Sequence, residues 1–301
     1  MGGRAGAVVP SSFSLGGLQR MVPPERVDVL TLGCYQRGMD RELRPAAHLE
    51  FDAFREAYLR RLTAPLDDMW SAFAEMAEPS GLFEQGECVG VCAVDGDRRM
   101  LRFCLRPELA SQSEDWLRFA VEGLGVTELI VPTYDPDFLA PALDLGARVS
   151  VHTLLFTECE PTEGPGVDAV RVAAPGDFDR LVDFQEAAIG APRAFLEDYV
   201  GARIERGELR WVGDAARVSA TGELRLDGGQ AEVAHLGLIV AADARGQGLG
   251  TRLLRTLRDE TLAQGRCPIC STERDNAAAR KAIERAGFRA RHRLLSVRVG
   301  A

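Results

Sequence analysis

Two segments of the sequence, one in each half, follow the same order of elements. Residues 126–156 and 265–297 each indicate a strand, a turn, a short helix, a glycine and a second strand. Asp135–Gly146 and Asn276–Gly287 have the same length, so the residue before each helix and the glycine behind it keep their spacing. A shared order with little sequence identity is typical of an internal repeat. We therefore expect two domains built on the same fold.

The composition changes between the two halves. Residues 158–168, ECEPTEGPGVD, are acidic, contain proline and glycine, and show no hydrophobic periodicity, which is typical of a linker. The chain has 301 residues, and each side of this segment is about as long as a domain of moderate size. The predicted organisation is a disordered leader at 1–25, a first domain at 26–158, a linker at 159–168 and a second domain at 169–301.

Charge and hydropathy weigh against two classes of partner. A formal net charge of −9 argues against a general nucleic-acid surface. No apolar run has the length of a membrane span, and the N-terminal residues lack the apolar core of a signal peptide. We expect a cytoplasmic protein that binds neither nucleic acid nor a membrane.

The cysteines are odd in number and scattered along the chain. Cys267 and Cys270 form a CxxC, the spacing of a redox pair or of half a zinc site. No second CxxC and no nearby pair of histidines completes a metal set. The segment also fits a buried strand, in which these two thiols face opposite sides. We therefore expect no metal site.

A glycine-rich turn lies between an apolar strand and a leucine-rich helix. It comprises Arg245, Gly246, Gln247, Gly248, Leu249 and Gly250, and Thr251 follows. Backbone N–H groups at such a turn suit an anion, as does the positive end of the helix dipole, and Arg245 adds a positive charge. The spacing excludes a Walker P-loop, which needs a Lys before Ser or Thr. It also excludes a dinucleotide fingerprint, which needs a third glycine three positions after the second.

This turn and a later segment together resemble the GNAT acetyltransferase superfamily. The pattern Arg/Gln-x-x-Gly-x-Gly, here Arg245 to Gly250, follows a strand and opens a helix, as the central motif of that family does. Asn276 to Phe288, NAAARKAIERAGF, resembles the family's Asn–helix–Gly–Phe segment. The resemblance covers about residues 167–299. With the internal repeat, it implies an α/β (α+β) chain of two GNAT-like domains, each a mixed, mostly antiparallel central sheet flanked by helices.

The resemblance also implies a reaction, which is acyl transfer from acetyl-CoA to an amine of a small-molecule or peptide acceptor. The turn would hold the CoA pyrophosphate, and the strand Leu236–Val240 would splay from its neighbour and pair with the pantetheine arm. Asn276 would contact the same arm from the next helix. The implied cofactor-binding residues are Leu238, Ile239, Val240, Arg245, Gly246, Gln247, Gly248, Leu249, Gly250, Thr251 and Asn276.

Transfer to an amine needs a group that accepts the ammonium proton, and three residues are candidates. Glu232 stands where some members of the family carry a catalytic glutamate, Glu223 lies on the neighbouring strand, and His235 has a suitable ordinary pKa. Each also fits a structural role, as a solvated strand residue or a hydrogen-bonded core histidine. Because Glu232 and His235 are three positions apart on one strand, they face opposite sides and are not expected to act together.

One position departs from the family pattern. Many GNAT enzymes carry a Tyr before the closing glycine as the general acid for the leaving thiolate, and here this position is Ile283. Either another group such as Cys270 or Ser271 donates the proton, or water does, or none is needed. Two alternatives to N-acetyltransfer stay open, and the Ile283 departure favours the first. One is a non-catalytic, regulatory acetyl-CoA-binding module, and the other is a transferase of a longer acyl group with a roomier pocket near Ile239.

The first half lacks the glycine turn. Its counterpart is Arg106–Leu117, RPELASQSEDWL, which contains no glycine and is interrupted by Pro107. Glu114 and Asp115 stand early in the following helix, where they would repel a pyrophosphate. We expect that the first domain keeps the fold and has lost the CoA site, so that the chain has one such site.

Overall fold

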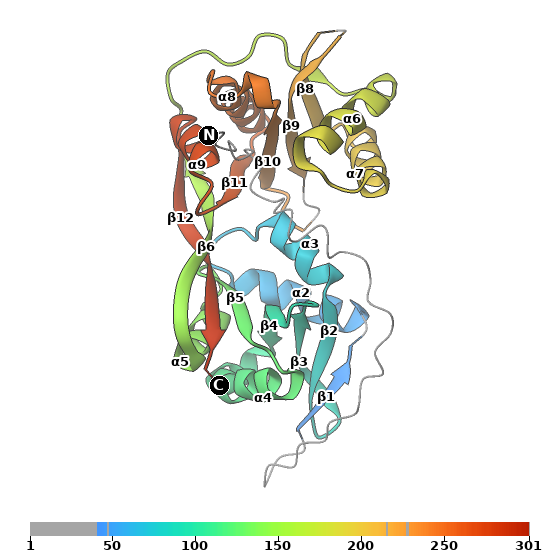
Figure 1. Ribbon diagram of the computed structural model, residues 1–301. Coiled ribbons are helices and arrows are strands. Elements are labelled where there is room, and N and C mark those ends of the chain that lie inside the picture. The colour runs from blue at the N-terminus through green and yellow to red at the C-terminus, as the bar shows by residue number, and fades with distance from the viewer. Residues whose placement is uncertain (1–40, 47, 215, 227–228, 301) are drawn as a thin grey trace, which may run out of the picture. The chain divides into compact units, whose positions relative to one another are not determined.

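The computed structural model describes residues 41–46, 48–214, 216–226 and 229–300 (Figure 1). They form two compact units: an N-terminal unit of residues 41–153 with 292–300, and a C-terminal unit of residues 154–291. The expected leader at 1–25 lies outside the described residues.

The C-terminal unit has the element order that the sequence predicts. Its elements are β7 (Arg171–Val172), η2 (Pro175–Asp177), α6 (Phe178–Ile189), α7 (Arg193–Glu205), β8 (Leu209–Gly213), β9 (Val218–Leu226), β10 (Val233–Val240), η3 (Ala242–Ala244), α8 (Leu249–Ala263), β11 (Cys267–Glu273), α9 (Ala277–Arg285) and the start of β12 (Phe288–Val299). The strand order is β12-β6-β11-β10-β9-β8-β7. β10 runs parallel to β11, whereas β7, β8, β9 and β10 pair antiparallel in succession. The sheet is mixed and mostly antiparallel, as expected.

Side chains alternate along β9 and β10, so the sheet has two distinct faces. Gly222 on β9 faces α8, because a Cβ at that position would lie only 2.9 Å from Leu257 Cδ1. The antiparallel register pairs Leu238 with Gly222, which puts Leu238 on the α8 face. It pairs Gly237 with Glu223, which puts both on the opposite face, where α6 packs (Figure 1).

Helix α8 is held to its face by leucines spaced for one side of a helix. Leu253, Leu254 and Leu257 are all buried against the sheet. At about 25 cal/mol per Å² of buried apolar surface, each contributes roughly 2 kcal/mol to folding. This burial fixes the start of α8, and with it the glycine turn, at the carboxyl end of β10.

The N-terminal unit repeats the plan. Its elements are β1 (Arg41–Pro45), α2 (His48–Arg61), α3 (Asp68–Met76), β2 (Glu78–Glu84), β3 (Glu87–Val94), β4 (Arg99–Leu105), η1 (Pro107–Gln112), α4 (Ser113–Leu124), β5 (Glu128–Pro132), α5 (Pro136–Leu145) and β6 (Gly146–Cys159). The strand order is β1-β2-β3-β4-β5-β12-β6. Its core includes Met100, Phe103, Trp116, Leu129 and Phe138, each at most 1% exposed.

Each unit completes its sheet with a strand from the other half of the sequence. In the N-terminal unit, β5 pairs antiparallel with the end of β12, from Leu294↔Pro132 to Arg298↔Glu128. In the C-terminal unit, the neighbour of β11 is β6. Both exchanged strands are long, with 14 residues in β6 and 12 in β12. The repeat seen in the sequence is therefore a repeat of elements. The last strand of each compact unit, however, comes from the other half of the sequence.

Candidate functional site

The glycine turn lies directly between β10 and α8. Gly246 and Gly248 have φ angles of 75° and 77°, in the left-handed region that side chains rarely adopt. A Cβ at either position would meet no atom within 4 Å, so these glycines are required by the backbone conformation and not by crowding. Both residues are exposed, and the turn presents its backbone to the outside of the unit.

The start of α8 offers backbone donors without a competing side chain. Gly248 is the N-cap and provides no side-chain hydrogen bond, and the first bond of the helix runs from Arg252 N to Gly248 O at 3.1 Å. The N–H groups of Leu249, Gly250 and Thr251 precede that bond and have no acceptor within the helix. With the positive end of the helix dipole, these groups have the chemistry that suits an anion.

The polar side chains of the turn brace its backbone. Arg245 donates from Nε to the carbonyl of Val240 at 3.1 Å, and Gln247 donates from Nε2 to the carbonyl of Asp243 at 3.0 Å. Arg217 forms an ion pair with Asp243 from the β8–β9 hairpin. The turn is thus tied to the end of β10, which keeps its N–H groups in a defined orientation.

β10 and β11 part beside this turn. They pair in parallel from Val233↔Cys267 to His235↔Ile269, although β10 continues to Val240 and β11 to Glu273. β10 keeps its other partner throughout and remains paired with β9 up to Val240. The opening leaves backbone groups around Leu238 and Ile239 on the β11 side without a strand partner. The geometry matches the splay that the family resemblance implies.

A buried polar cluster lies on the face opposite α8, where the strands begin to part. Glu223 and Arg225 form an ion pair, and Glu223 Oε2 also accepts a 2.8 Å hydrogen bond from the hydroxyl of Tyr199 on α7. Glu223 and Arg225 are 5% and 7% exposed. The register places His235 opposite Arg225 and Gly237 opposite Glu223, so all four share one face.

The absence of a side chain at Gly237 leaves space for the Glu223–Arg225 ion pair. A Cβ at Gly237 would lie 2.8 Å from Arg225 Nη1 and 3.2 Å from Glu223 Oε2. Burial, and after it the negative charge of Glu223, raises the pKa of Tyr199, which therefore keeps its proton and donates. The structure thus brings together two of the three predicted base candidates, Glu223 and His235.

Glu232, the third candidate, lies elsewhere. It precedes β10, is exposed, and stands at the end of that strand remote from the glycine turn. Its backbone carbonyl accepts from Cys267 N at 2.8 Å, at the start of the paired part of β10 and β11.

Sequence reasoning missed Tyr199 and Arg225. Arg225 had a signal, because Glu223 and Arg225 are opposite charges two positions apart on one strand and so face the same side. Tyr199 had none, because its approach to Glu223 depends on how α7 packs.

Helix α9 carries the two remaining positions singled out from the sequence. Asn276 is its N-cap, and its side chain accepts a 3.1 Å hydrogen bond from Ala279 N. Ile283 is only 5% exposed and belongs to the apolar side of the helix. The position of the family's general acid is thus occupied by an apolar core residue.

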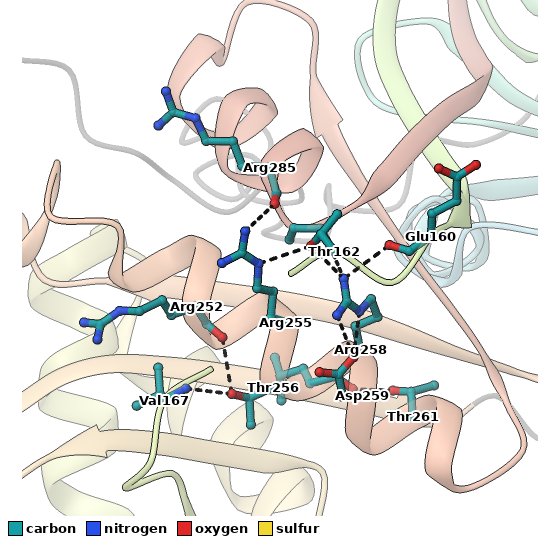
Figure 2. A network of polar contacts seen from close by, with 12 residues as sticks. Glu160, Thr162, Val167, Arg252, Arg255, Thr256, Arg258, Asp259, Thr261 and Arg285 are labelled. Carbon is teal, nitrogen blue, oxygen red and sulfur yellow. Dashed lines mark hydrogen bonds and ion pairs between the residues drawn. The ribbon is translucent and has the colours of Figure 1, made fainter. Parts of the chain in front are cut away.

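A buried arginine, Arg258, joins the helix of the turn to the end of α9. Figure 2 shows its contacts with Glu160 and Thr162. Arg258 on α8 is 2% exposed and donates to the carbonyls of Ala286 and Glu160 and to Thr162 Oγ1, at 2.5, 3.3 and 3.1 Å. Because Ala286 caps α9, this contact fixes α8 relative to the helix that begins at Asn276.

The segment expected to be a linker, 159–168, lies along helix α8. Arg255 of α8 donates to Thr162 Oγ1 at 3.2 Å, and Val167 N donates to Thr256 Oγ1 at 2.9 Å. These bonds hold the segment on α8 (Figure 2). The domain limits predicted from the sequence stay predictions.

The CxxC segment forms β11. Cys270 is buried, whereas Cys267, the first residue of the strand, is exposed, and both are free thiols. Among the described residues, no three His, Cys, Asp or Glu side chains are grouped as metal ligands. Within the same residues, no helix is both long and apolar enough to cross a bilayer.

The corresponding turn of the N-terminal unit is built differently. β4 leads into the 3-10 helix Pro107–Gln112, and α4 follows with Glu114 and Asp115 in its first turn. The N-cap of α4, Gln112, has a φ of −108°, so this turn needs no left-handed residue.

Comparison with known proteins gives one family match in each half of the chain. Residues 49–159 match an acetyltransferase (GNAT) domain family, and residues 182–288 match the acetyltransferase (GNAT) family. A search of curated proteins found no match.

Several solved structures share the fold. A GNAT-family acetyltransferase from Colwellia psychrerythraea is 32% identical, with a TM-score of 0.81 over 86% of this chain and 100% of that one. A GCN5-related N-acetyltransferase from Sphaerobacter thermophilus is 14% identical, with a TM-score of 0.59 over 87% and 97%. A tandem GNAT protein from the clavulanic acid biosynthesis pathway is 15% identical, with a TM-score of 0.53 over 87% and 99%.

The two more distant structures support the fold alone. The 32% identity to the Colwellia protein extends over most of both chains, and the two family matches fall on the two halves of the sequence. The chain therefore belongs to the GNAT family of acetyltransferases and carries two GNAT domains in tandem.

Proposed function

We propose that the C-terminal unit binds acetyl-CoA and transfers its acetyl group to an amine of a small-molecule or peptide acceptor. The observation that carries this proposal is the strand pair β10 and β11, which parts directly before a turn with two left-handed glycines. Such a turn suits the pyrophosphate, and such an opening suits an extended arm that carries amide groups. Membership of the GNAT family supplies the reaction class.

In this proposal the backbone of the turn holds the anion. The amides of Gly246–Thr251 bind the pyrophosphate, and Arg245 orients the turn by its bond to Val240 O. Backbone groups at Leu238–Val240 pair with the pantetheine arm, and Asn276 contacts it from the start of α9. A backbone N–H at this opening also stabilises the negative charge that develops on the thioester oxygen.

The acceptor amine approaches on the face that carries Glu223 and His235. We rank Glu223 first as general base, because Tyr199 and Arg225 hold its carboxylate in a fixed position beside the opening. His235 ranks second. Glu232 ranks last, because it is exposed at the other end of β10.

The general acid needs a separate assignment. A raised pKa makes the Tyr199 hydroxyl a weak acid, so its proposed role is to position Glu223 and not to protonate the leaving thiolate. With Ile283 buried on α9, water is the proposed proton donor.

All cysteines among the described residues are free thiols, which agrees with the proposed cytoplasmic location.

The buried Ile283 favours one alternative, a domain that binds acetyl-CoA without transferring its acetyl group. An acceptor screen separates the two functions. The purified protein, acetyl-CoA and a panel of primary amines, amino acids and peptide N-termini are incubated, and release of free CoA thiol is measured. The proposed function predicts release that depends on at least one amine and saturates with its concentration. Tight acetyl-CoA binding without amine-dependent release across the panel would support the alternative.

A further inference from the structure

The N-terminal unit opens its sheet at the same place as the C-terminal unit. β4 pairs in parallel with β5 only at Arg99 and Met100, and then continues to Leu105. Helix α5 follows β5, and its N-cap Asp135 accepts from Phe138 N at 3.3 Å, as Asn276 accepts for α9. The strand opening and the capped helix are thus present in both units.

The helix caps align the two openings residue by residue. Glu128 of β5 precedes Asp135 by as many positions as Ile269 of β11 precedes Asn276. The strand pairs then correspond as Arg99↔Glu128 with His235↔Ile269. Counting onward, Phe103 of β4 takes the place of Ile239 of β10. Ile239 is one of the residues whose backbone we assign to the CoA arm.

An arginine side chain of the same unit fills this opening. Arg61, the last residue of α2, donates from Nη2 to the carbonyl oxygen of Phe103 and to Asp135 Oδ2, both at 3.0 Å. Its Nη1 lies 3.5 Å from Asp137 Oδ2. The guanidinium therefore bridges the opened strand and the cap of the following helix, the two elements between which the arm runs in the proposed site of the C-terminal unit.

Burial makes this bridge hard to break. Asp135 is fully buried, and a buried carboxylate is stable only with a partner. Burial raises the pKa of Asp135, while the charge and hydrogen bonds of Arg61 act against that rise. The Tyr58 ring lies against the guanidinium, with Arg61 Cζ 5.0 Å from its centroid.

Little space is left beside the arginine. A small, partly open pocket bounded by Arg61, Phe103 and residues of the turn from Arg106 to Ser113 has a volume of about 10 Å³. That volume is at the lower limit for a single water molecule.

We propose that Arg61 is a built-in occupant of the N-terminal opening, taking the place that the pantetheine arm takes in the C-terminal unit. The N-terminal unit is then closed without acyl-CoA, and the chain binds one acyl-CoA and not two. The comparison with the arm rests on the proposed function of the C-terminal unit, whereas the closure by Arg61 and Asp135 does not.

The first test uses the unaltered full chain. Acetyl-CoA is titrated by calorimetry, and amide hydrogen exchange is measured with and without it. We expect one molecule bound per chain, with slower exchange at residues 236–251 and unchanged exchange at 101–113. Slower exchange at 101–113, or two molecules bound, would overturn the proposal. If no acetyl-CoA binds, the proposed function fails, and the second test decides on the closure alone.

The second test is a double-mutant cycle read by hydrogen exchange in β4 and α5. Arg61→Met keeps the apolar stem and removes the charge, and Asp135→Asn keeps a cap while removing the carboxylate. We expect Arg61→Met to speed exchange by about 10-fold or more, because it leaves a buried carboxylate unpaired. In the Asp135→Asn background the same change should have a much smaller effect.

A conservative variant covers the case in which Arg61→Met does not fold. Arg61→Lys keeps the charge but loses the planar guanidinium that can bind two partners at once. Its hydrogen-exchange rate in β4 and α5 should lie between those of the unaltered chain and of Arg61→Met. Equal effects of an Arg61 substitution in both backgrounds, or no effect in either, would show that Arg61 does not close the opening through Asp135.

Discussion

The passage from β10 to α8 and the passage from β4 to α4 hold the same place in the two units, but they present different backbones. The first passage contains Gly246 and Gly248, which both have left-handed backbone conformations and are exposed. The second is the 3-10 helix Pro107–Gln112, followed by acidic residues in the first turn of α4. The same fold therefore accommodates either connection, and only the first has the backbone that we propose for binding an anion.

The two units differ again on the sheet face away from this helix. In the C-terminal unit the face carries the Glu223–Arg225 ion pair. In the N-terminal unit Leu101 takes the place of Gly237 and packs with a cluster of alanines, Ala74, Ala77 and Ala93. The family match over residues 49–159 describes the fold of the N-terminal unit, while the residues that we propose for the chemistry lie in the other unit.

The largest expected effect comes from adding charge to the glycine turn. Asn and Asp both tolerate the left-handed conformation of Gly248, so Gly248→Asn and Gly248→Asp differ only in charge. A carboxylate about 4 Å from the pyrophosphate costs about 4 kcal/mol at an effective dielectric constant of 20. We expect Gly248→Asp to weaken acetyl-CoA binding about 1,000-fold relative to Gly248→Asn, measured by calorimetry.

Ala110→Asp provides the matched control, because Ala110 is an exposed residue of the N-terminal turn. It should leave the affinity for acetyl-CoA unchanged. A similar loss in both units, or equal affinities of the Gly248 variants, would remove the distinction between the two turns.

The next effect concerns the polar face. Glu223→Gln keeps the shape and removes the proposed base, so kcat should fall about 100-fold while acetyl-CoA affinity is retained. Tyr199→Phe keeps the ring and removes the 2.8 Å hydrogen bond to Glu223, and kcat should fall about 10-fold. Steady-state kinetics with an acceptor found in the screen would measure both. If Glu223→Gln retains full kcat and His235→Asn does not, the assignment of the base passes to His235.

The smallest effect concerns stability. Arg258→Met removes a buried donor from the carbonyls of Ala286 and Glu160 and should lower the free energy of unfolding by about 2 kcal/mol. Arg118→Met on α4 is the matched change in the N-terminal unit, because Arg118 is half exposed and, among the described residues, pairs with Glu114 of its own helix alone. It should cost about 0.5 kcal/mol or less in denaturant unfolding. Equal costs would contradict the structural role of the Arg258 network.

Local sequence patterns predicted most of the elements and the glycine turn. The glycines between β10 and α8, the leucine stripe of α8 and the caps Asp135 and Asn276 are all short-range features. Each acts through backbone conformation or helix periodicity, so neighbouring residues suffice to determine it. The absence of glycine and the presence of acids in the first half followed from the sequence in the same way.

The tertiary structure decided which side chains meet. Only the register of β9 and β10 puts Glu223, Arg225 and His235 on one face, and only the packing of α7 brings Tyr199 to Glu223. Glu232, equally plausible in the sequence, lies outside the strand.

Two further features could not be predicted from the sequence. One is that β6 and β12 each complete the sheet of the unit formed by the other half of the sequence, and the other is the position of Arg61 in the N-terminal opening. Each joins residues far apart in the chain through strand pairing and burial. No local pattern encodes such contacts, because their energy appears only once the sheet has formed.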